Sequence, residues 1–76
     1  MQAVLQRVNQ AKLVSGDNEI REIGRGIVVL VGIEKNDDET AARRMAKRLL
    51  EYRLFPALLG RMNLSVADIN GEILLV

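Results

Sequence analysis

The sequence of 76 residues contains no cysteine and no histidine. The lack of cysteine excludes a disulfide scaffold and thiolate-ligated metal sites, on which many small domains depend. The lack of histidine excludes Ser-His-Asp triads, Cys-His pairs and histidine-ligated zinc. With one tyrosine, one phenylalanine and no tryptophan, the chain also offers little aromatic surface on which nucleic-acid bases could stack.

Long hydrophobic runs are missing as well. The longest apolar stretch, Ile27 to Ile33, is interrupted by Gly32 and is too short to cross a bilayer. Gln6 and Arg7 fall where the apolar core of a signal peptide would lie. We therefore expect no membrane partner, and a soluble protein in the reducing environment of the cytoplasm.

The net charge of +1 conceals an uneven distribution of charge. Residues 40–67 hold six basic residues and one acidic residue, whereas the remainder holds five basic and nine acidic residues. Such a basic segment indicates either a surface that faces a polyanion or an ordinary solvated helix face. Hydrophobic residues make up 49% of the chain and charged residues 28%, which is typical of a globular domain rather than a disordered one.

Apolar patterning and turn signals predict an α+β fold with an antiparallel or mixed sheet of about five strands. The segments from which these strands are expected are 3–8, 12–14, 19–23, 27–33, 52–55 and 72–76. The continuously apolar segment 27–33 should be buried on both faces, and Gly32 should mark a bulge or a close backbone approach. The apolar final strand should need a partner strand from further sequence or from another chain. We expect residues 1–76 to be a single domain and the N-terminal portion of a larger one.

One amphipathic helix is predicted at about 38–51. Asn36, which has capping-box-like spacing to Glu39, and Asp37 are equally good candidates for its N-cap. The expected apolar stripe consists of Ala41, Ala42, Met45, Ala46, Leu49 and Leu50, and the opposite side carries Arg43, Arg44, Lys47 and Arg48. Like charges four residues apart cost roughly 0.2–0.5 kcal/mol per pair in an isolated helix. These four residues are therefore candidate contacts for an anionic partner.

No recognisable catalytic centre is visible in these residues. Ser15 lies in a turn, and Ser65 should bond locally or lie on a strand face, since neither has a base at motif spacing. Asp37 and Asp38 lack the alternating ligand spacing of a calcium loop. We therefore expect no metal site and no cofactor.

Several segments, in register and without gaps, nevertheless form a specific pattern. They are Gln6-Arg7-Val8, Glu22-Ile23-Gly24, Val29-Leu30-Val31-Gly32-Ile33-Glu34-Lys35 with Asp37-Asp38, Tyr52-Arg53-Leu54-Phe55 and Gly60-Arg61-Met62-Asn63-Leu64-Ser65-Val66. This pattern resembles the N-terminal half of the D-aminoacyl-tRNA deacylases of bacteria and eukaryotes. The segment Pro56-Ala57-Leu58-Leu59 departs from the polar loop that the family usually has there.

The resemblance implies a homodimeric, β-barrel-like α+β enzyme, of which this chain would form a partial barrel. Such an enzyme hydrolyses the ester between a D-amino acid, or glycine, and tRNA as a proofreading step of translation. No catalytic residue is expected in this chain, because the family's Ser-Gln-x-x-Thr and Gly-cisPro motifs would follow Val76. Arg7 matches an arginine that supports the Gly-cisPro loop, and Met62, Asn63 and Leu64 match a segment near the pocket for the terminal adenosine.

Each of these residues also has a plain structural interpretation. Arg7 would be a solvated strand residue, Met62 and Leu64 would belong to the core, and Asn63 would cap a loop. Two alternative functions also remain open at this point: a small non-catalytic RNA-binding module that uses the basic helix face, and a dimerisation module that presents the final strand.

Overall fold

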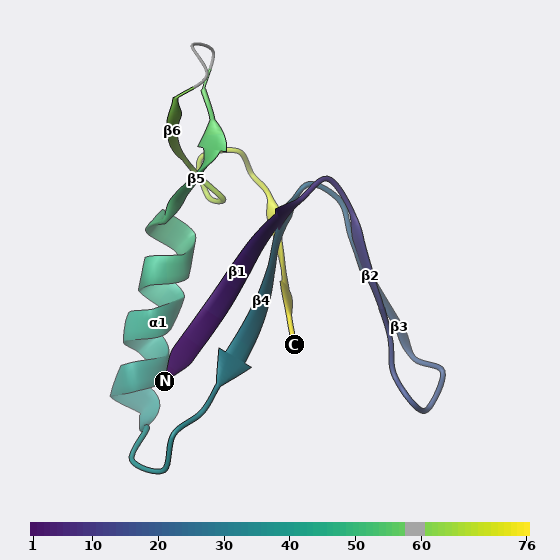
Figure 1. The fold of residues 1–76 in the computed structure, drawn as a ribbon, viewed down its shortest axis with the longest axis vertical. Helices are drawn as coiled ribbons and strands as arrows, with labels where there is room; N and C mark the ends of the chain where they lie inside the picture. The colour runs from purple at the N-terminus through teal and green to yellow at the C-terminus, as the bar shows by residue number, and fades with distance from the viewer. Residues whose placement is uncertain (58–60) are drawn as a thin grey trace.

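A computed structural model describes residues 1–57 and 61–76, which form seven strands and one helix (Figure 1). In chain order these are β1 (Gln2–Val8), β2 (Ala11–Val14), β3 (Ile20–Ile23), β4 (Gly26–Gly32), α1 (Glu39–Glu51), β5 (Arg53–Pro56), β6 (Met62–Ser65) and β7 (Glu72–Leu75). The expected departure at Leu58 and Leu59 lies outside the described residues. None of the helical structure described is both long and apolar enough to span a bilayer.

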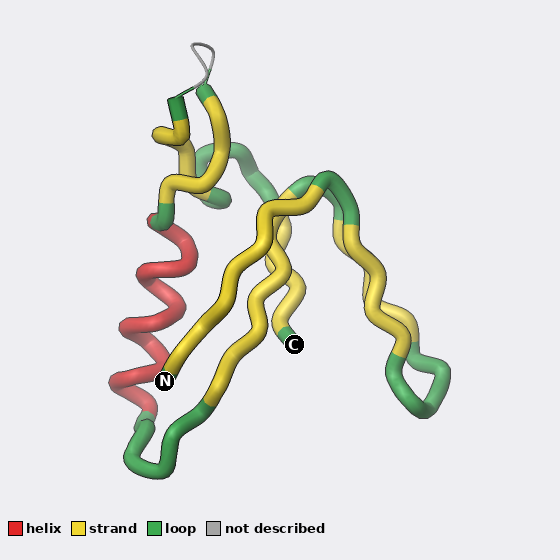
Figure 2. The backbone as a smooth tube through the Cα atoms, in the orientation of Figure 1, coloured by secondary structure: helices red, strands yellow, loops and turns green. Residues whose placement is uncertain are grey.

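The central sheet has the strand order β1-β4-β7, with β1 antiparallel and β7 parallel to β4. Two hairpins, β2–β3 and β5–β6, form separate two-stranded sheets on either side of it (Figure 2). The predicted α+β class is confirmed, but the chain has seven strands divided among three sheets rather than about five strands in one sheet. The first hairpin leaves the central sheet because the chain bends at Asn9 and again at Gly24-Arg25.

Helix α1 lies beside β1, the edge strand of the central sheet, and begins after Asp38 (Figure 1). The Asp38 carboxylate accepts a hydrogen bond from the backbone N–H of Ala41 at 2.9 Å and therefore caps the helix. The predicted range is confirmed, but the choice of Asn36 or Asp37 as the cap is wrong. The Asp37 side chain is already engaged, because it accepts a hydrogen bond from the backbone N–H of Glu34 at 2.7 Å.

Asp37 also holds the amino end of the chain. Its carboxylate lies 2.9 Å from the α-ammonium group of Met1, and the Met1 side chain is only 11% exposed. The Glu34 N–H and then this ammonium group keep the pKa of Asp37 below its ordinary value. The same contact raises the pKa of the Met1 α-ammonium above its ordinary 8.0. The ion pair thus ties the start of β1 to the segment that leads into α1.

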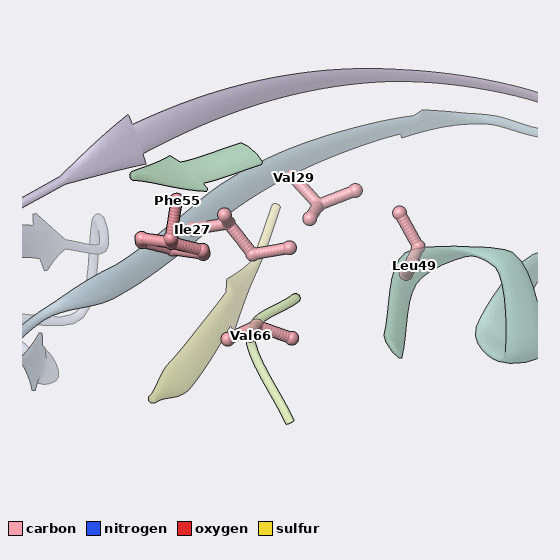
Figure 3. Close-up of a cluster of buried hydrophobic side chains, with 5 residues drawn as sticks. All are labelled: Ile27, Val29, Leu49, Phe55 and Val66. Atoms are coloured by element: carbon pink, nitrogen blue, oxygen red, sulfur yellow. The ribbon is translucent and has the colours of Figure 1, made fainter. Parts of the chain in front are cut away.

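The buried core consists of five apolar side chains from four parts of the chain (Figure 3). They are Ile27 and Val29 of β4, Leu49 of α1, Phe55 of β5 and Val66 just after β6. Burying each of them stabilises the fold by about 1.5–3 kcal/mol. Because β1 places Ala3 and Leu5 on the same face as these β4 residues, α1 and the β5–β6 hairpin cover one face of the sheet.

The other face of the central sheet is largely uncovered. Val4 and Leu30 are register partners on it and are 66% and 49% exposed, and Ile33 beyond it is 77% exposed. The prediction that segment 27–33 is buried on both faces is therefore wrong beyond Val29. On the helix, likewise, only Ala41, Met45 and Leu49 of the predicted stripe turn inward, since α1 packs on a single sheet.

The open face gives the molecule more surface than its mass requires. The accessible surface is 6002 Å², whereas a compact monomer of 8.5 kDa has about 4,700 Å². The radius of gyration of 13.7 Å likewise exceeds the value of about 11 Å for a compact chain of this length. The molecule measures only 16 Å along its shortest axis, so there is one layer of helix on one layer of sheet.

Strand β7 finds its neighbour within the chain. It pairs in parallel with β4, from Gly26 with Glu72 to Val29 with Leu75. The expectation that this strand needs a partner from outside is therefore wrong for one of its edges. Within residues 1–57 and 61–76, its other edge pairs with no strand.

The close backbone approach occurs at Gly26, not at Gly32. A Cβ atom at Gly26 would collide with the backbone carbonyl oxygen of Glu72, because β7 runs directly beside this position. Gly32 instead continues the regular pairing with Gln2, and a Cβ atom there would lie 3.9 Å from the nearest backbone oxygen. The predicted bulge at Gly32 is wrong, and the β4–β7 pairing requires glycine at the first residue of β4.

We predict that Gly26→Ala destabilises the chain, whereas Gly32→Ala does not. Overpacking of this kind costs about 1–3 kcal/mol, because β7 must move away from β4. Gly32→Ala is the matched control, since its methyl group has space and alanine lowers the entropy of the unfolded chain. Urea unfolding of both variants measures the difference. Equal unfolding midpoints would show that β7 does not pack against Gly26.

We also predict a pH-dependent loss of stability in Asp37→Asn. The lowered pKa of the Asp37 carboxylate stabilises the fold above about pH 4, and this stabilisation is lost as the pH falls. The raised pKa of the Met1 ammonium group stabilises the fold below about pH 8, and this stabilisation is lost as the pH rises. Asp37→Asn should therefore lower the melting temperature most near pH 6, and the difference from wild type should shrink above the Met1 pKa. Asp38→Asn is the control, because asparagine caps helices as well as aspartate. An equal difference at pH 6 and pH 10 would contradict the ion pair.

Candidate functional site

Arg7 ends the apolar row Ala3–Leu5 on β1 and lies opposite Ile27 of β4. Because a guanidinium group cannot be buried without acceptors, the sequence predicts that Arg7 is exposed or finds an acceptor in place of the Gly-cisPro loop. Both hold. Arg7 is exposed, and one terminal N–H group donates to the backbone carbonyl of Leu54 on β5 at 2.8 Å. The same nitrogen lies 3.2 Å from the sulfur of Met62 on β6.

The structure brings Arg7 and Met62 together, but it does not bring Asn63 and Leu64 to the same place. Met62 is 53% exposed beside the arginine, and Asn63 is exposed with its backbone N–H bonded to the Arg61 carbonyl at 3.0 Å. Leu64 is half-buried and packs against the core. Alternation along β6 accounts for Asn63, since successive side chains of a strand point to opposite faces, whereas Leu64 differs from Met62 in lying further along the strand, where the chain joins the core.

Arg7 stands between two shallow hollows. One has a volume of about 430 Å³ and is lined by Leu5, Gln6, Arg7, Arg53, Leu54 and Met62. The other is lined by Arg7, Val8, Asn9, Arg25 and Pro56. Arg25 also lies over the ring of Phe55, with its guanidinium carbon 5.3 Å from the ring centroid, which fixes its position by a cation–π contact.

Three arginines thus gather at strand β5, and only Arg7 among them is predicted from the sequence as a site residue. In the described part of the chain, Arg7, Arg25 and Arg53 form no ion pair with an acidic residue. Arg53 is close enough to Asp68 to help lower the pKa of that carboxyl, whereas the charges of Arg7 and Arg25 remain available to an anionic ligand. Arg53, within Tyr52-Arg53-Leu54-Phe55, and Arg25, which follows Gly24, were visible in the sequence as basic residues. Only the pairing of strands shows that they converge.

The segment after β6 is fixed by a reciprocal pair of hydrogen bonds. The Ser65 backbone N–H donates to the Asp68 carboxylate at 2.8 Å, and the Asp68 backbone N–H donates to the Ser65 hydroxyl at 3.1 Å. The Ser65 N–H and then its hydroxyl lower the pKa of Asp68. Ser65 is buried, so the prediction that it bonds locally is confirmed.

These groups can bind and orient an anion, but they do not form an acid–base pair. The pKa values of Asp17, Asp37 and Asp68 are all lowered by hydrogen bonds, which makes these carboxylates weak proton acceptors near neutral pH. No three acidic residues of the described ranges come close enough to hold a metal ion. The site is therefore built of arginine side chains and backbone carbonyls.

The basic face of α1 is a second cationic surface. Arg43, Arg44, Lys47 and Arg48 are all exposed, as predicted. They are not equivalent, however. Arg43 forms an ion pair with Glu39 at 2.6 Å, whereas Arg44 and Arg48 border the groove between α1 and β1. Tyr52, at the C-cap of the helix, lies at the same groove and was not among the predicted site residues.

The fold and the site together define an α+β class in which an open three-stranded sheet carries one helix and an arginine-rich site. The family described as D-Tyr-tRNA(Tyr) deacylase matches residues 4–76, and the chain belongs to this family. The resemblance noted in the sequence is thereby confirmed.

Individual relatives agree with this membership. D-aminoacyl-tRNA deacylases from Histophilus somni and Nitrosococcus oceani are 46% and 50% identical to the chain over all 76 residues. The chain spans about half the length of these relatives, 53% and 49% respectively. A solved structure named c-Myc DNA Unwinding Element Binding Protein matches 99% of the chain and 51% of its own, with a TM-score of 0.89 and 39% identity.

Proposed function

We propose that this chain is the N-terminal portion of a D-aminoacyl-tRNA deacylase, a hydrolase that cleaves the ester between a D-amino acid, or glycine, and tRNA. The observation that carries the proposal is the match of the whole chain to relatives of that name at 45–50% identity. In this proposal the enzyme proofreads aminoacyl-tRNA in the cytoplasm, and the Ser-Gln-x-x-Thr motif and the Gly-cisPro motif, which excludes L-amino acids sterically, come from sequence outside this chain.

The charges around β5 support tRNA as the substrate. The 3′ end of an aminoacyl-tRNA is a polyanion, and Arg7, Arg25 and Arg53 offer planar guanidinium groups suited to phosphate and carbonyl oxygens. The terminal nucleotide would then lie in the hollow beside Met62, with Asn63 and Leu64 on the same strand. The basic residues of α1, namely Arg43, Arg44, Lys47 and Arg48, would face the more distant phosphates.

Arg7 is proposed as a positioning residue rather than a catalytic one. A guanidinium group carries five donors in one plane, and the bonds of one terminal nitrogen to the Leu54 carbonyl and the Met62 sulfur use two of them. The remaining donors can bind two adjacent backbone carbonyls, which is what support of the Gly-cisPro loop requires. A lysine ammonium group has no such planar geometry.

We also propose that the intact protein is a homodimer. The surplus of roughly 1,300 Å² over a compact monomer and the exposed pair Val4 and Leu30 support burial of the open sheet face in a larger assembly. The same face supports the second candidate function, a dimerisation module without activity. The two candidates differ in whether the assembled protein turns over substrate.

We predict that residues 1–76 alone do not hydrolyse D-tyrosyl-tRNA, and that a chimera does. The chimera joins these residues to the part of the Histophilus somni relative that follows its matched half. It should release D-tyrosine at a rate similar to that of the relative and should form a dimer, because the N-terminal half keeps its own internal contacts. Turnover by the 76-residue chain above a buffer blank, or a folded chimera without turnover, would contradict the proposal.

We predict that Arg7→Ala in the chimera weakens the discrimination between D- and L-aminoacyl-tRNA or lowers the activity. Misplacement of a substrate-contacting loop by about 1 Å costs up to ~100-fold in rate, and Arg7→Lys should restore little of it. Arg21→Ala, which removes an exposed arginine from β3, is the control. Rates of D- and L-aminoacyl-tRNA hydrolysis and melting temperatures are compared. If Arg7→Ala leaves both rates unchanged, or only unfolds the protein, Arg7 is a structural residue.

A further inference from the structure

A groove of about 430 Å³ runs between α1 and β1, the edge strand of the central sheet, and residues from both faces of β1 line it, among them Leu5 and Val4. Its floor is apolar and includes Ala3, Leu5, Met45 and Leu49. The exposed Tyr52 and Arg48 also line it, and Arg44 lines a smaller hollow that shares Met45 and Arg48 with the groove. The groove thus combines apolar surface, one aromatic ring and two cations.

The two basic rows of α1 differ in what surrounds them. Arg44, Arg48 and Tyr52 follow one another at intervals of four residues and therefore lie along one side of the helix, beside the groove. Arg43 and Lys47 form the neighbouring row, and the acidic partner Glu39 already occupies Arg43. In the described residues Arg44 and Arg48 have no acidic partner.

We propose that this groove binds a single-stranded segment of RNA, with one base stacked on Tyr52 and the flanking phosphates on Arg44 and Arg48. The charge of the row selects a polyanion, and the ring with its apolar floor selects a ligand that also has planar bases. Duplex RNA would hide its bases from the ring. Tyr52 is thus assigned a binding role that the basic face alone does not suggest.

The inference rests on the proposed function only for the identity of the ligand, which is RNA rather than another polyanion. It specifies which part of an RNA the helix meets: an unpaired stretch, contacted by one row of the helix and not by all four basic residues. It also distinguishes this contact from the one made by the arginines around β5, namely Arg7, Arg25 and Arg53.

The test is fluorescence anisotropy of a labelled single-stranded RNA, on the order of eight nucleotides long, titrated with the 76-residue chain at several KCl concentrations. Arg44→Gln with Arg48→Gln should weaken binding and flatten the salt dependence by about 1–2 units, since each phosphate contact on a single strand contributes about 0.7. Arg43→Gln with Lys47→Gln makes the same charge change on the same helix. This control should flatten the slope by less than half as much.

The ring is tested separately. Tyr52→Ala should weaken binding about 5- to 150-fold without changing the salt slope, and Tyr52→Phe should restore it, because stacking needs only the ring. Circular dichroism confirms that these variants of exposed residues keep their helix. Equal effects of the two charge pairs, no effect of Tyr52→Ala, tighter binding to a duplex of the same sequence, or binding to anionic vesicles in place of RNA would overturn the proposal.

Failure of the proposed function gives a different result. If the chimera does not deacylate tRNA but the variants change RNA binding as stated, only the deacylase proposal fails. If the chimera deacylates and Arg44→Gln with Arg48→Gln changes neither RNA binding nor KM, only the groove proposal fails.

Discussion

Ile27 and Val29 of β4 lie at the centre of the core, because the helix, the β5–β6 hairpin and the turn before β7 all pack against them. Leu49 reaches them from the helix, Phe55 from the β5–β6 hairpin and Val66 from the turn that leads to β7. These contacts fix the distance between β1 and α1, and so the width of the groove. They also place β5 beside the end of β1, where the Leu54 carbonyl meets the Arg7 guanidinium group. The position of the candidate site therefore follows from the core and not from local loop structure.

The uncovered sheet face agrees with the finding that the chain matches about half the length of its relatives. A sheet covered by one helix on one face leaves apolar residues such as Val4 and Leu30 in water, which a protein normally avoids by adding another layer. The relatives have about twice as many residues as this chain. The helix side, in contrast, already has its own core, and there the cationic groups lie at the rim of packed apolar surface.

Local signals in the sequence predicted local structure well. The helix range, the turn at Ser15–Asn18 and most strand positions follow from periodicity and turn residues. Contacts between distant segments could not be predicted in this way. Nothing near Gly26 indicates that Glu72 passes beside it, and nothing near Asp37 indicates that its carboxylate pairs with the Met1 ammonium group. Of the site, Arg7 and Met62 could be named, but Arg25, Arg53 and Tyr52 join them only through strand pairing and helix packing.

The parallel pairing of β4 with β7 also sets an order for folding. Strands β1 and β4 lie early in the sequence and can pair antiparallel as soon as both have been synthesised. The second edge of β4 receives its neighbour only when residues 72–75 follow. Such pairing is slow, because closing so long a loop costs conformational entropy before any contact forms that offsets the cost. During synthesis, the most apolar strand of the protein therefore spends time with one open edge, where a chaperone or another nascent chain can reach it before β7 does.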